Sequence, residues 1–351
     1  MDGDTQLYFS PDYATARRRF QETARRAGAV LEALELDARG PAGEDLAIDV
    51  AHWGTQDPRR ALLHSSGLHG VEGFAGSAIQ LQLLQDVPRL AENTALIIVH
   101  VLNPFGMAWL RRVNENSVDL NRNSCFHGSY AGAPSAYAKL DSFLNPQSPP
   151  SSDFFLVKAA SLILRYGMAT LKQSIAGGQY EYPKGLFFGG KRLEQGLERY
   201  QAFLRRRLGS VEAVLAIDVH TGLGKYAEDT LLVAAEDYDR LGPIFGKRVR
   251  AMEAKRGPAY RPQGGLADLL SAALPQAHVD FIGQEFGTYN PVKVLHALRE
   301  ENRWHHYGSG TVPHPTKRAL KQAFCPDDES WRRAVLKRGR ELVEDGRRSL
   351  L

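Results

Sequence analysis

The sequence predicts an α/β protein in which a central β-sheet lies between layers of helices. Residues 94–104, TALIIVHVLNP, form an almost continuous apolar run, which is typical of a strand buried on both faces of a sheet. Similar runs occur at 212–220 and 278–287, and segments with the apolar spacing of a helix lie between them. Strands that alternate with helices indicate a sheet covered by helices.

The first part of the chain supplies further elements in order. Residues 11–35 have an amphipathic pattern that starts near Pro11, which predicts a helix. DLAIDVAHWG (45–54) and RALLHSS (60–66) predict two strands separated by a turn-rich stretch. Helical spacing then runs from Gly73 to about residue 87.

The middle of the chain is less regular. Residues 128–153 are rich in Ser, Pro and Gly, residues 154–173 have helical spacing, and residues 176–190 are rich in glycine. We predict that the apolar face of 154–173 packs in a core and does not bind a cofactor. No repeat or linker forces a second domain, so we predict one domain over residues 1–351, with about residues 128–200 as an insertion or lid within it.

Composition narrows the function. The chain has 351 residues, 43% hydrophobic and 24% charged, with a formal net charge of +4. Basic and acidic residues are interspersed, which argues against a nucleic-acid partner. The two cysteines, Cys125 and Cys325, form no CxxC motif, and no apolar run approaches membrane-spanning length. We expect a soluble cytoplasmic protein without a membrane partner; a homo-oligomer stays open.

Four polar clusters follow predicted strands. His69 and Glu72 follow 60–66, the basic stretch RRVNENSVDLNRN (111–123) comes after 94–104, His220 ends 212–220, and Glu285 lies near the end of 278–287. Functional groups of α/β sheets collect beyond the carboxyl ends of the strands. We therefore expect these clusters to meet.

His69, Glu72 and His220 form the ligand set of a hydrolytic zinc site, two histidines and one carboxylate with a position left for water. His-x-x-Glu alone is weak evidence and could be a solvated turn. Gly67 and Gly70 disfavour a regular first helical turn, so His69 is expected to end a loop and Glu72 to open a helix.

Glu285 is the candidate general base and acid, because a carboxylate after an apolar strand should not be buried without a partner. A salt-bridged strand end is the alternative. Arg111, Arg112, Asn121 and Arg122 could bind a substrate carboxylate or stabilise an oxyanion, or could form a surface loop.

Other polar residues have different interpretations. His64 and His100 lie inside apolar strands and are expected to be hydrogen-bonded core residues. Asp218 shares a strand face with His220 and could orient it. Asp218 could also bind a second metal with His127 or another residue.

The ordered motifs resemble the zinc carboxypeptidase superfamily, which includes the succinylglutamate desuccinylase and aspartoacylase group. They are His69-x-x-Glu72, NPFG followed by RRVNENSVDLNRN, IDVHTG, and a glutamate on a late strand. YFSPDYATARRRF, GQYEYPKGLFFGG, EFGTY and CPDDESWRRAVLKRGRELV are similar to a bacterial branch usually labelled a domain of unknown function. This resemblance covers nearly the whole chain.

The resemblance implies a mixed, mostly parallel sheet with helices on both faces and one catalytic Zn²⁺ per chain. It assigns His69, Glu72 and His220 as ligands and Glu285 as general base and acid. Arg112 matches the arginine that polarises the scissile carbonyl, with Arg111 as the fallback.

Asn121 and Arg122 match the pair of residues that binds the terminal carboxylate of the substrate in that superfamily. The mobile tyrosine of the peptidases stays unassigned among Tyr180, Tyr182 and Tyr289. Residues 178–190 are expected to line the pocket.

These expectations predict a zinc-dependent hydrolase that cleaves an amide bond in a small peptide or an acylated amino acid. One alternative is an N-acyl amino acid deacylase of the desuccinylase and aspartoacylase type. Another is a non-catalytic binding module on the same fold.

Overall fold

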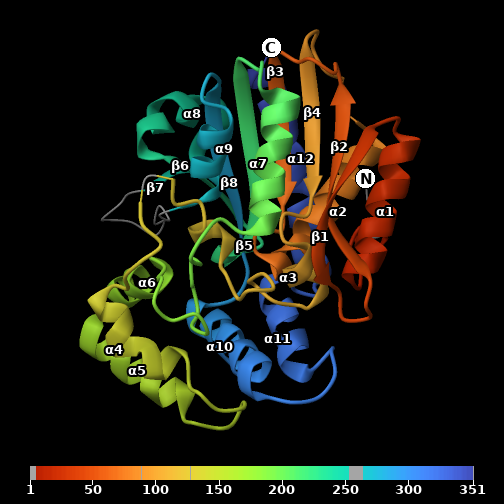
Figure 1. The fold of residues 1–351 in the computed structure, drawn as a ribbon. Coiled ribbons are helices and arrows are strands. Elements are labelled where there is room, and N and C mark those ends of the chain that lie inside the picture. Colours follow the sequence, from red (N-terminus) through yellow and green to blue (C-terminus); the bar gives the residue numbers. More distant parts are fainter. Residues whose placement is uncertain (1–4, 88, 127, 253–263, 351) are drawn as a thin grey trace.

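A central β-sheet organises the computed structural model, which describes residues 5–87, 89–126, 128–252 and 264–350 (Figure 1). Within these residues the sheet has eight strands in the order β1-β2-β4-β3-β5-β8-β6-β7. Their bounds are β1 Val30–Arg39, β2 Asp45–Gly54, β3 Arg60–Ser66, β4 Thr94–His100, β5 Ala213–Tyr226, β6 Asp229–Ala234, β7 Val249–Met252 and β8 His278–Gly287.

The strand directions confirm the mixed, mostly parallel sheet. Strands β4, β3, β5 and β8 run parallel to one another, and β6 runs parallel to β7, whereas the pairs β1–β2, β2–β4 and β6–β8 are antiparallel. The central parallel block therefore brings four carboxyl ends to one edge of the sheet. The strands predicted at 60–66, 94–104, 212–220 and 278–287 are the four strands of this block.

Helices cover both faces of the sheet, as predicted. One face packs against α1 (Tyr13–Arg26), α2 (Gly73–Gln85), α8 (Tyr238–Phe245) and α12 (Glu329–Ser349), which contribute to one apolar core. The other face packs against α7 (Gln195–Leu208) and α9 (Leu266–Ala273), which share a second core. These two layers lie on the faces of the sheet and not beyond the carboxyl edge of its central strands (Figure 1).

A third group of helices lies beyond that edge (Figure 1). It contains α4 (Ser135–Leu144), α5 (Phe155–Tyr166), α6 (Met168–Ala176), α10 (Pro291–Tyr307) and α11 (Pro315–Phe324). Side chains of α4, α6, α10 and α11 form a separate apolar core. The helices α4, α5 and α6 come from the expected insertion, whereas α7 begins at Gln195 and already packs on the sheet.

Shorter elements complete the description. They are α3 (Pro104–Ala108) and five single-turn 3₁₀ helices, η1 (Thr5–Leu7), η2 (Gly70–Glu72), η3 (Leu120–Arg122), η4 (Ala235–Asp237) and η5 (Gly246–Arg248). No helix of the described residues is long and apolar enough to cross a membrane.

The predicted helix over 11–35 is too long. Helix α1 ends at Arg26, Gly28 follows with a φ of +79°, and residues 30–39 form the edge strand β1. A left-handed residue breaks the helix, and antiparallel pairing with β2 then outweighs the helical pattern of 30–35. Gly167, with a φ of +77°, likewise divides the helical segment 154–173 into α5 and α6.

The two strand histidines are core residues, as expected. His64 and His100 have no exposed surface, and their ring nitrogens lie within hydrogen-bond distance of Gln80 and Ser77 on α2. Burial lowers the pKa of each histidine to about 4, so both are neutral.

Candidate metal and catalytic site

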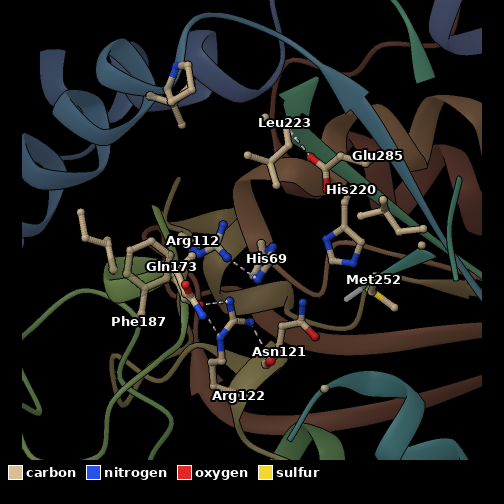
Figure 2. A pocket seen from close by; sticks show the side chains of 18 of the residues that line it. His69, Arg112, Asn121, Arg122, Gln173, Phe187, His220, Leu223, Met252 and Glu285 are labelled. Atoms are coloured by element: carbon tan, nitrogen blue, oxygen red, sulfur yellow. Dashed lines mark hydrogen bonds between the residues drawn. The ribbon is translucent and has the colours of Figure 1, made fainter. Parts of the chain in front are cut away.

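Three side chains from separate elements meet at the carboxyl edge of the sheet. His69 follows β3, Glu72 closes η2, and His220 lies in β5. A ligand atom of each lies within 4.8 Å of the other two, and all three side chains are buried. The predicted ligand set is therefore assembled in space (Figure 2 shows the two histidines).

The glycines before Glu72 set the path of this loop. Gly67 has a φ of +65°, in the left-handed region. A Cβ atom on Gly70 would lie 2.2 Å from the carbonyl carbon of Gly106, so the loop approaches α3 too closely for a side chain. His69 adopts an extended conformation before η2, and Glu72 directly precedes α2. The predicted loop end and helix start are confirmed.

Glu72 faces both histidines. Its Oε1 lies 3.0 Å from His69 Nδ1 and its Oε2 lies 3.3 Å from His220 Nδ1. His69 Nδ1 is buried and makes no hydrogen bond, because its contact with Glu72 has the distance but not the direction of one. A buried nitrogen without a partner, next to a carboxylate and a second imidazole, fits a metal ligand.

A second carboxylate stands behind each histidine. Asp119 Oδ1 lies 3.1 Å from His69 Nε2, and Asp218 Oδ2 lies 2.7 Å from His220 Nε2. Ser65 donates a hydrogen bond of 2.6 Å to the other oxygen of Asp218. Such carboxylates fix the ring orientation of metal-binding histidines. The orienting position expected of Asp218 is thus observed, whereas the second-metal alternative used His127, which lies outside the described residues.

Asp119 is a site residue that the sequence interpretation missed. It lies two residues before Asn121 in the DLNRN stretch, so its position next to predicted site residues was the available signal. Burial by itself would raise the pKa of Asp119, but Arg112, His69 and Arg122 hold it well below its ordinary value.

Neighbouring charges shift the pKa values of two of the candidate ligands, Glu72 and His220. Burial would raise the pKa of Glu72, but His69, His220 and Arg112 hold it below the ordinary value. Glu72 also accepts a hydrogen bond of 2.9 Å from the backbone amide of Thr221. Burial would lower the pKa of His220, but Asp218 and Glu72 raise it well above its ordinary value. Both carboxylates therefore favour the protonated form of the His220 imidazole when no metal is bound.

Glu285 lies beside the ligands. It is the register partner of His220 on the neighbouring parallel strand, and it is buried. Its Oε1 accepts a hydrogen bond of 2.9 Å from the backbone amide of Leu223, as Figure 2 shows. Burial and the nearby charge of Glu72 raise the pKa of Glu285 to about 8. A carboxyl group tuned toward neutral pH can both take up and release a proton.

Arg112 reaches into the same cluster. Its Nη1 lies 3.2 Å from Glu72 Oε1, and its Nε donates a hydrogen bond of 3.1 Å to Asp119 Oδ2. Its guanidinium carbon is 5.3 Å from the centroid of the Phe187 ring. Phe187 belongs to the glycine-rich stretch that was expected to line the pocket, and it has a φ of +59°. Such backbone conformations in bulky residues occur often at functional sites.

Asn121 and Arg122 also line the cavity. Arg122 donates to the carbonyl oxygen of Ala176, at the end of α6, through Nε at 3.1 Å and Nη2 at 2.6 Å. Arg111 lies elsewhere. It is fully buried, pairs with Glu301 at 3.1 Å, and is not among the residues that line the cavity. The structure thus brings Arg112 and Arg122 to the site, but not Arg111.

The site opens into one large cavity of about 1030 Å³. His69, Glu72, Arg112, His220 and Glu285 lie on its polar side. Its remaining wall is mainly apolar and includes side chains from the helices of the third group, α4, α5, α6, α10 and α11. This volume is at the upper end of the usual range for small-molecule sites.

None of the three candidate tyrosines lines this cavity among the described residues. The hydroxyl of Tyr180 donates a hydrogen bond of 2.8 Å to the carbonyl oxygen of Arg122. Tyr182 packs beside Tyr137, and Tyr289 lies near Tyr226. The structure therefore gives none of them the role of the mobile tyrosine.

Comparisons with known proteins give one family match. A family model described as a protein of unknown function (DUF2817) matches residues 9–338. None of the curated proteins matches the chain in sequence.

Several solved structures are similar at low identity. Carboxypeptidase A from Helicoverpa armigera is 15% identical with a TM-score of 0.48, and the match covers 91% of this chain and 74% of that one. A metallocarboxypeptidase from Pseudomonas aeruginosa is 15% identical with a TM-score of 0.40, and the match covers 92% of this chain and 69% of that one. The murein-tripeptide amidase MpaA from Escherichia coli O157 is 16% identical with a TM-score of 0.37, and the match covers 78% of this chain and 92% of that one.

Proposed function

The chain belongs to the DUF2817 family of proteins of unknown function, and from the geometry of its site we propose that it is a zinc-dependent hydrolase of amide bonds. The buried cluster of His69, Glu72 and His220 carries this proposal. The motifs described above resemble those of zinc carboxypeptidases, and this resemblance implies the same roles for these residues.

Zinc suits this donor set. Two imidazoles and one carboxylate are a common ligand set of hydrolytic zinc sites, and each imidazole here has a carboxylate behind it. Asp119 and Asp218 would hold the ring nitrogens in place while Nδ1 of each histidine faces the metal. When bound, Zn²⁺ would activate a water molecule and polarise the substrate carbonyl.

Glu285 is the proton carrier of the proposed reaction. It accepts a proton from the attacking water and delivers one to the leaving amine, so the carboxylate is regenerated when the carbon–nitrogen bond breaks. The products are a carboxylate and an amine. Its raised pKa and its position beside His220 support this role.

Arg112 is assigned to the oxygen of the scissile carbonyl, where negative charge develops. Asn121 and Arg122 are assigned to a free carboxylate of the substrate. Arg122 donates to a backbone carbonyl in this structure, and a carboxylate would replace that contact with a stronger, charge-assisted one. A substrate with both groups is a peptide with a free C-terminus or an acylated amino acid.

The test combines metal analysis with hydrolysis assays on panels of peptides and N-acyl amino acids. We expect about one zinc ion per chain, turnover in the wild type, and a loss of at least about 100-fold in kcat for Glu285→Gln with zinc retained. The matched control is Glu212→Gln, an exposed glutamate just before the amino end of β5, which should leave kcat unchanged.

Three outcomes contradict the proposal. A protein that binds no zinc after incubation with it lacks the site, and unchanged turnover in Glu285→Gln removes the proposed proton carrier. Tight ligand binding without turnover in fully metallated wild type would identify a non-catalytic binding module. The relative rates on the two panels separate a peptidase from a deacylase.

A further inference from the structure

We propose that the apolar wall of the cavity binds a long aliphatic chain, so that the substrate is an amino acid acylated with a fatty acid. This inference rests on the proposed hydrolase function and names its substrate class. It is carried by the residues of the third group of helices that line the cavity; the polar residues Glu236, Asp237, Asp268 and Ser271 line another part of it.

The wall formed by the third group of helices is almost free of polar side chains. The lining residues from these helices are Leu140, Phe143, Ala159, Leu162, Ile163, Met168, Ala169, Leu171, Gln173, Ile175, Ala176, Pro291, Val292, Val294, Leu295, Leu298 and Phe324. Of these lining residues, all of which the structure describes, Gln173 alone has a polar side chain. This wall therefore offers a ligand mostly contact with hydrocarbon.

Such a wall is poorly suited to a peptide chain. Each peptide unit carries a donor and an acceptor that lose hydrogen bonds to water when they enter an apolar site, and this costs free energy unless new partners are present. A methylene chain has no such groups and is stabilised by the same surroundings. The chemistry of the wall therefore selects an aliphatic chain.

The wall is also too large for one amino-acid side chain. The cavity measures about 1030 Å³, and its apolar lining extends over five helices. On the inner side of α5, Leu162 and Ile163 are only partly buried although they line the cavity. Apolar surface left partly exposed toward a cavity can be covered by a bound chain.

The polar end of the same cavity supplies the other half of the recognition. Arg112, Asn121 and Arg122 line it beside the metal cluster and offer two cations to a carboxylate and a carbonyl. A ligand that satisfies both ends has an amide and a free carboxylate next to a long hydrocarbon chain. An N-acyl amino acid with a fatty acyl group is such a ligand.

The first experiment measures chain-length dependence. N-acyl glycines and N-acyl phenylalanines with acyl chains from C2 to C16, together with N-acetyl amino acids that have long alkyl side chains, are assayed with the zinc-loaded wild type. Binding of the same compounds to zinc-loaded Glu285→Gln is measured by calorimetry. We expect kcat/KM and affinity to rise about threefold to fourfold per added methylene and to level off when the chain fills the cavity.

A second set of variants tests the location. Ala159→Phe fills the wall at a buried position of α5, and we expect it to lose activity on long chains while activity on acetyl compounds is retained. If Ala159→Phe does not fold, Leu162→Asn tests the same wall by placing a polar side chain in it. The matched control is Leu164→Gln, a 91% exposed position on the outer face of α5. It should change neither the activity on long chains nor the activity on acetyl compounds.

The outcomes separate this inference from the proposed function. Chain-length-dependent binding without turnover in the wild type would keep the chain site and overturn the hydrolase. Turnover of acetyl compounds or peptides with no gain from longer chains would keep the hydrolase and overturn the chain site. A gain confined to N-acetyl amino acids with long alkyl side chains would overturn the acyl assignment.

Discussion

Asp119 connects His69 to Arg112. Its Oδ1 lies 3.1 Å from His69 Nε2, the ring nitrogen opposite the one that faces Glu72, and its Oδ2 accepts a hydrogen bond of 3.1 Å from Arg112 Nε. One fully buried carboxylate thus contacts both a proposed metal ligand and the arginine proposed to act on the substrate. The orientation of both side chains depends on a residue that touches neither the metal ligand atoms nor the substrate.

Replacement of this carboxylate should weaken metal binding without removing a ligand. We expect Asp119→Asn to lower the affinity for Zn²⁺ by about 10-fold to 100-fold, because His69 loses the negative partner that orients its ring. Competition with a chelator of known affinity measures the change. Asp57→Asn, an exposed aspartate in the turn before β3, is the control and should bind zinc like the wild type. Equal affinity of Asp119→Asn would show that Asp119 does not support the site.

Metal binding should release a proton from His220. Without metal the pKa of His220 is raised well above its ordinary value by Asp218 and Glu72, so the imidazole is protonated at neutral pH. A zinc ligand must be deprotonated, so affinity should rise with pH, about tenfold per unit below that pKa if one proton is released. Calorimetry at pH 8 in buffers of different ionisation enthalpy counts the protons.

The matched variant for this prediction is Asp218→Asn. It removes the charge that raises the pKa of His220 most, so the metal-free imidazole should be less protonated and release fewer protons on binding zinc. Any proton from Glu285 is released in both proteins and cancels in the comparison. Equal proton release by both proteins would contradict the assignment.

The positions of site residues near strand ends were predictable from the sequence, whereas the contacts that loops make across the site were not. His220 and Glu285 follow apolar runs, and parallel strands end at a common edge, so their proximity follows from the pattern. Asp218 shares a strand face with His220 and was recognised for that reason.

Asp119 approaches His69 through a folded loop, across 50 positions of sequence, which no local pattern encodes. The choice between Arg111 and Arg112 depended on the same loop. The backbone amides of Gly70 and Val71 donate hydrogen bonds to the carbonyl oxygens of Arg112 and Arg111, which holds the backbone of both arginines beside η2. The strand at 30–39 was missed because its pairing with β2 is a tertiary interaction.

Glu301 should be a strong determinant of stability. Its buried carboxylate is the partner of two buried cations, Arg111 and Lys317, and burial lowers the pKa of Lys317 to about 8 even with this partner present. Glu301→Gln leaves both cations without a counter-charge, and we expect a loss of about 3–5 kcal/mol in the free energy of unfolding. Denaturant titration of the metal-free protein measures it.

The double variant Glu301→Gln/Lys317→Met is the informative comparison. It removes one of the two uncompensated charges and replaces it with an apolar side chain of similar length, so it should be more stable than Glu301→Gln alone. If the double variant were less stable than Glu301→Gln, the buried charge would not be the cause of the loss.

Gly70 should be intolerant of even one methyl group. A Cβ atom there would lie 2.2 Å from the carbonyl carbon of Gly106 and 2.3 Å from the amide nitrogen of Met107, both backbone atoms that cannot rotate away. Gly70→Ala must therefore displace the loop that carries His69 and Glu72. We expect a loss of about 1–3 kcal/mol in stability together with weaker zinc binding, measured by denaturant titration and chelator competition.

Gly196 provides the matched control for this substitution. It is buried at the start of α7, but a Cβ atom there would meet its nearest neighbour, Ile48 Cδ1, at an ordinary contact distance of 3.7 Å. Because alanine favours the helix over glycine by about 1 kcal/mol, Gly196→Ala should leave stability unchanged or raise it, with zinc affinity as in the wild type. If Gly70→Ala matched Gly196→Ala in both measurements, close backbone packing at Gly70 would not be what positions His69 and Glu72.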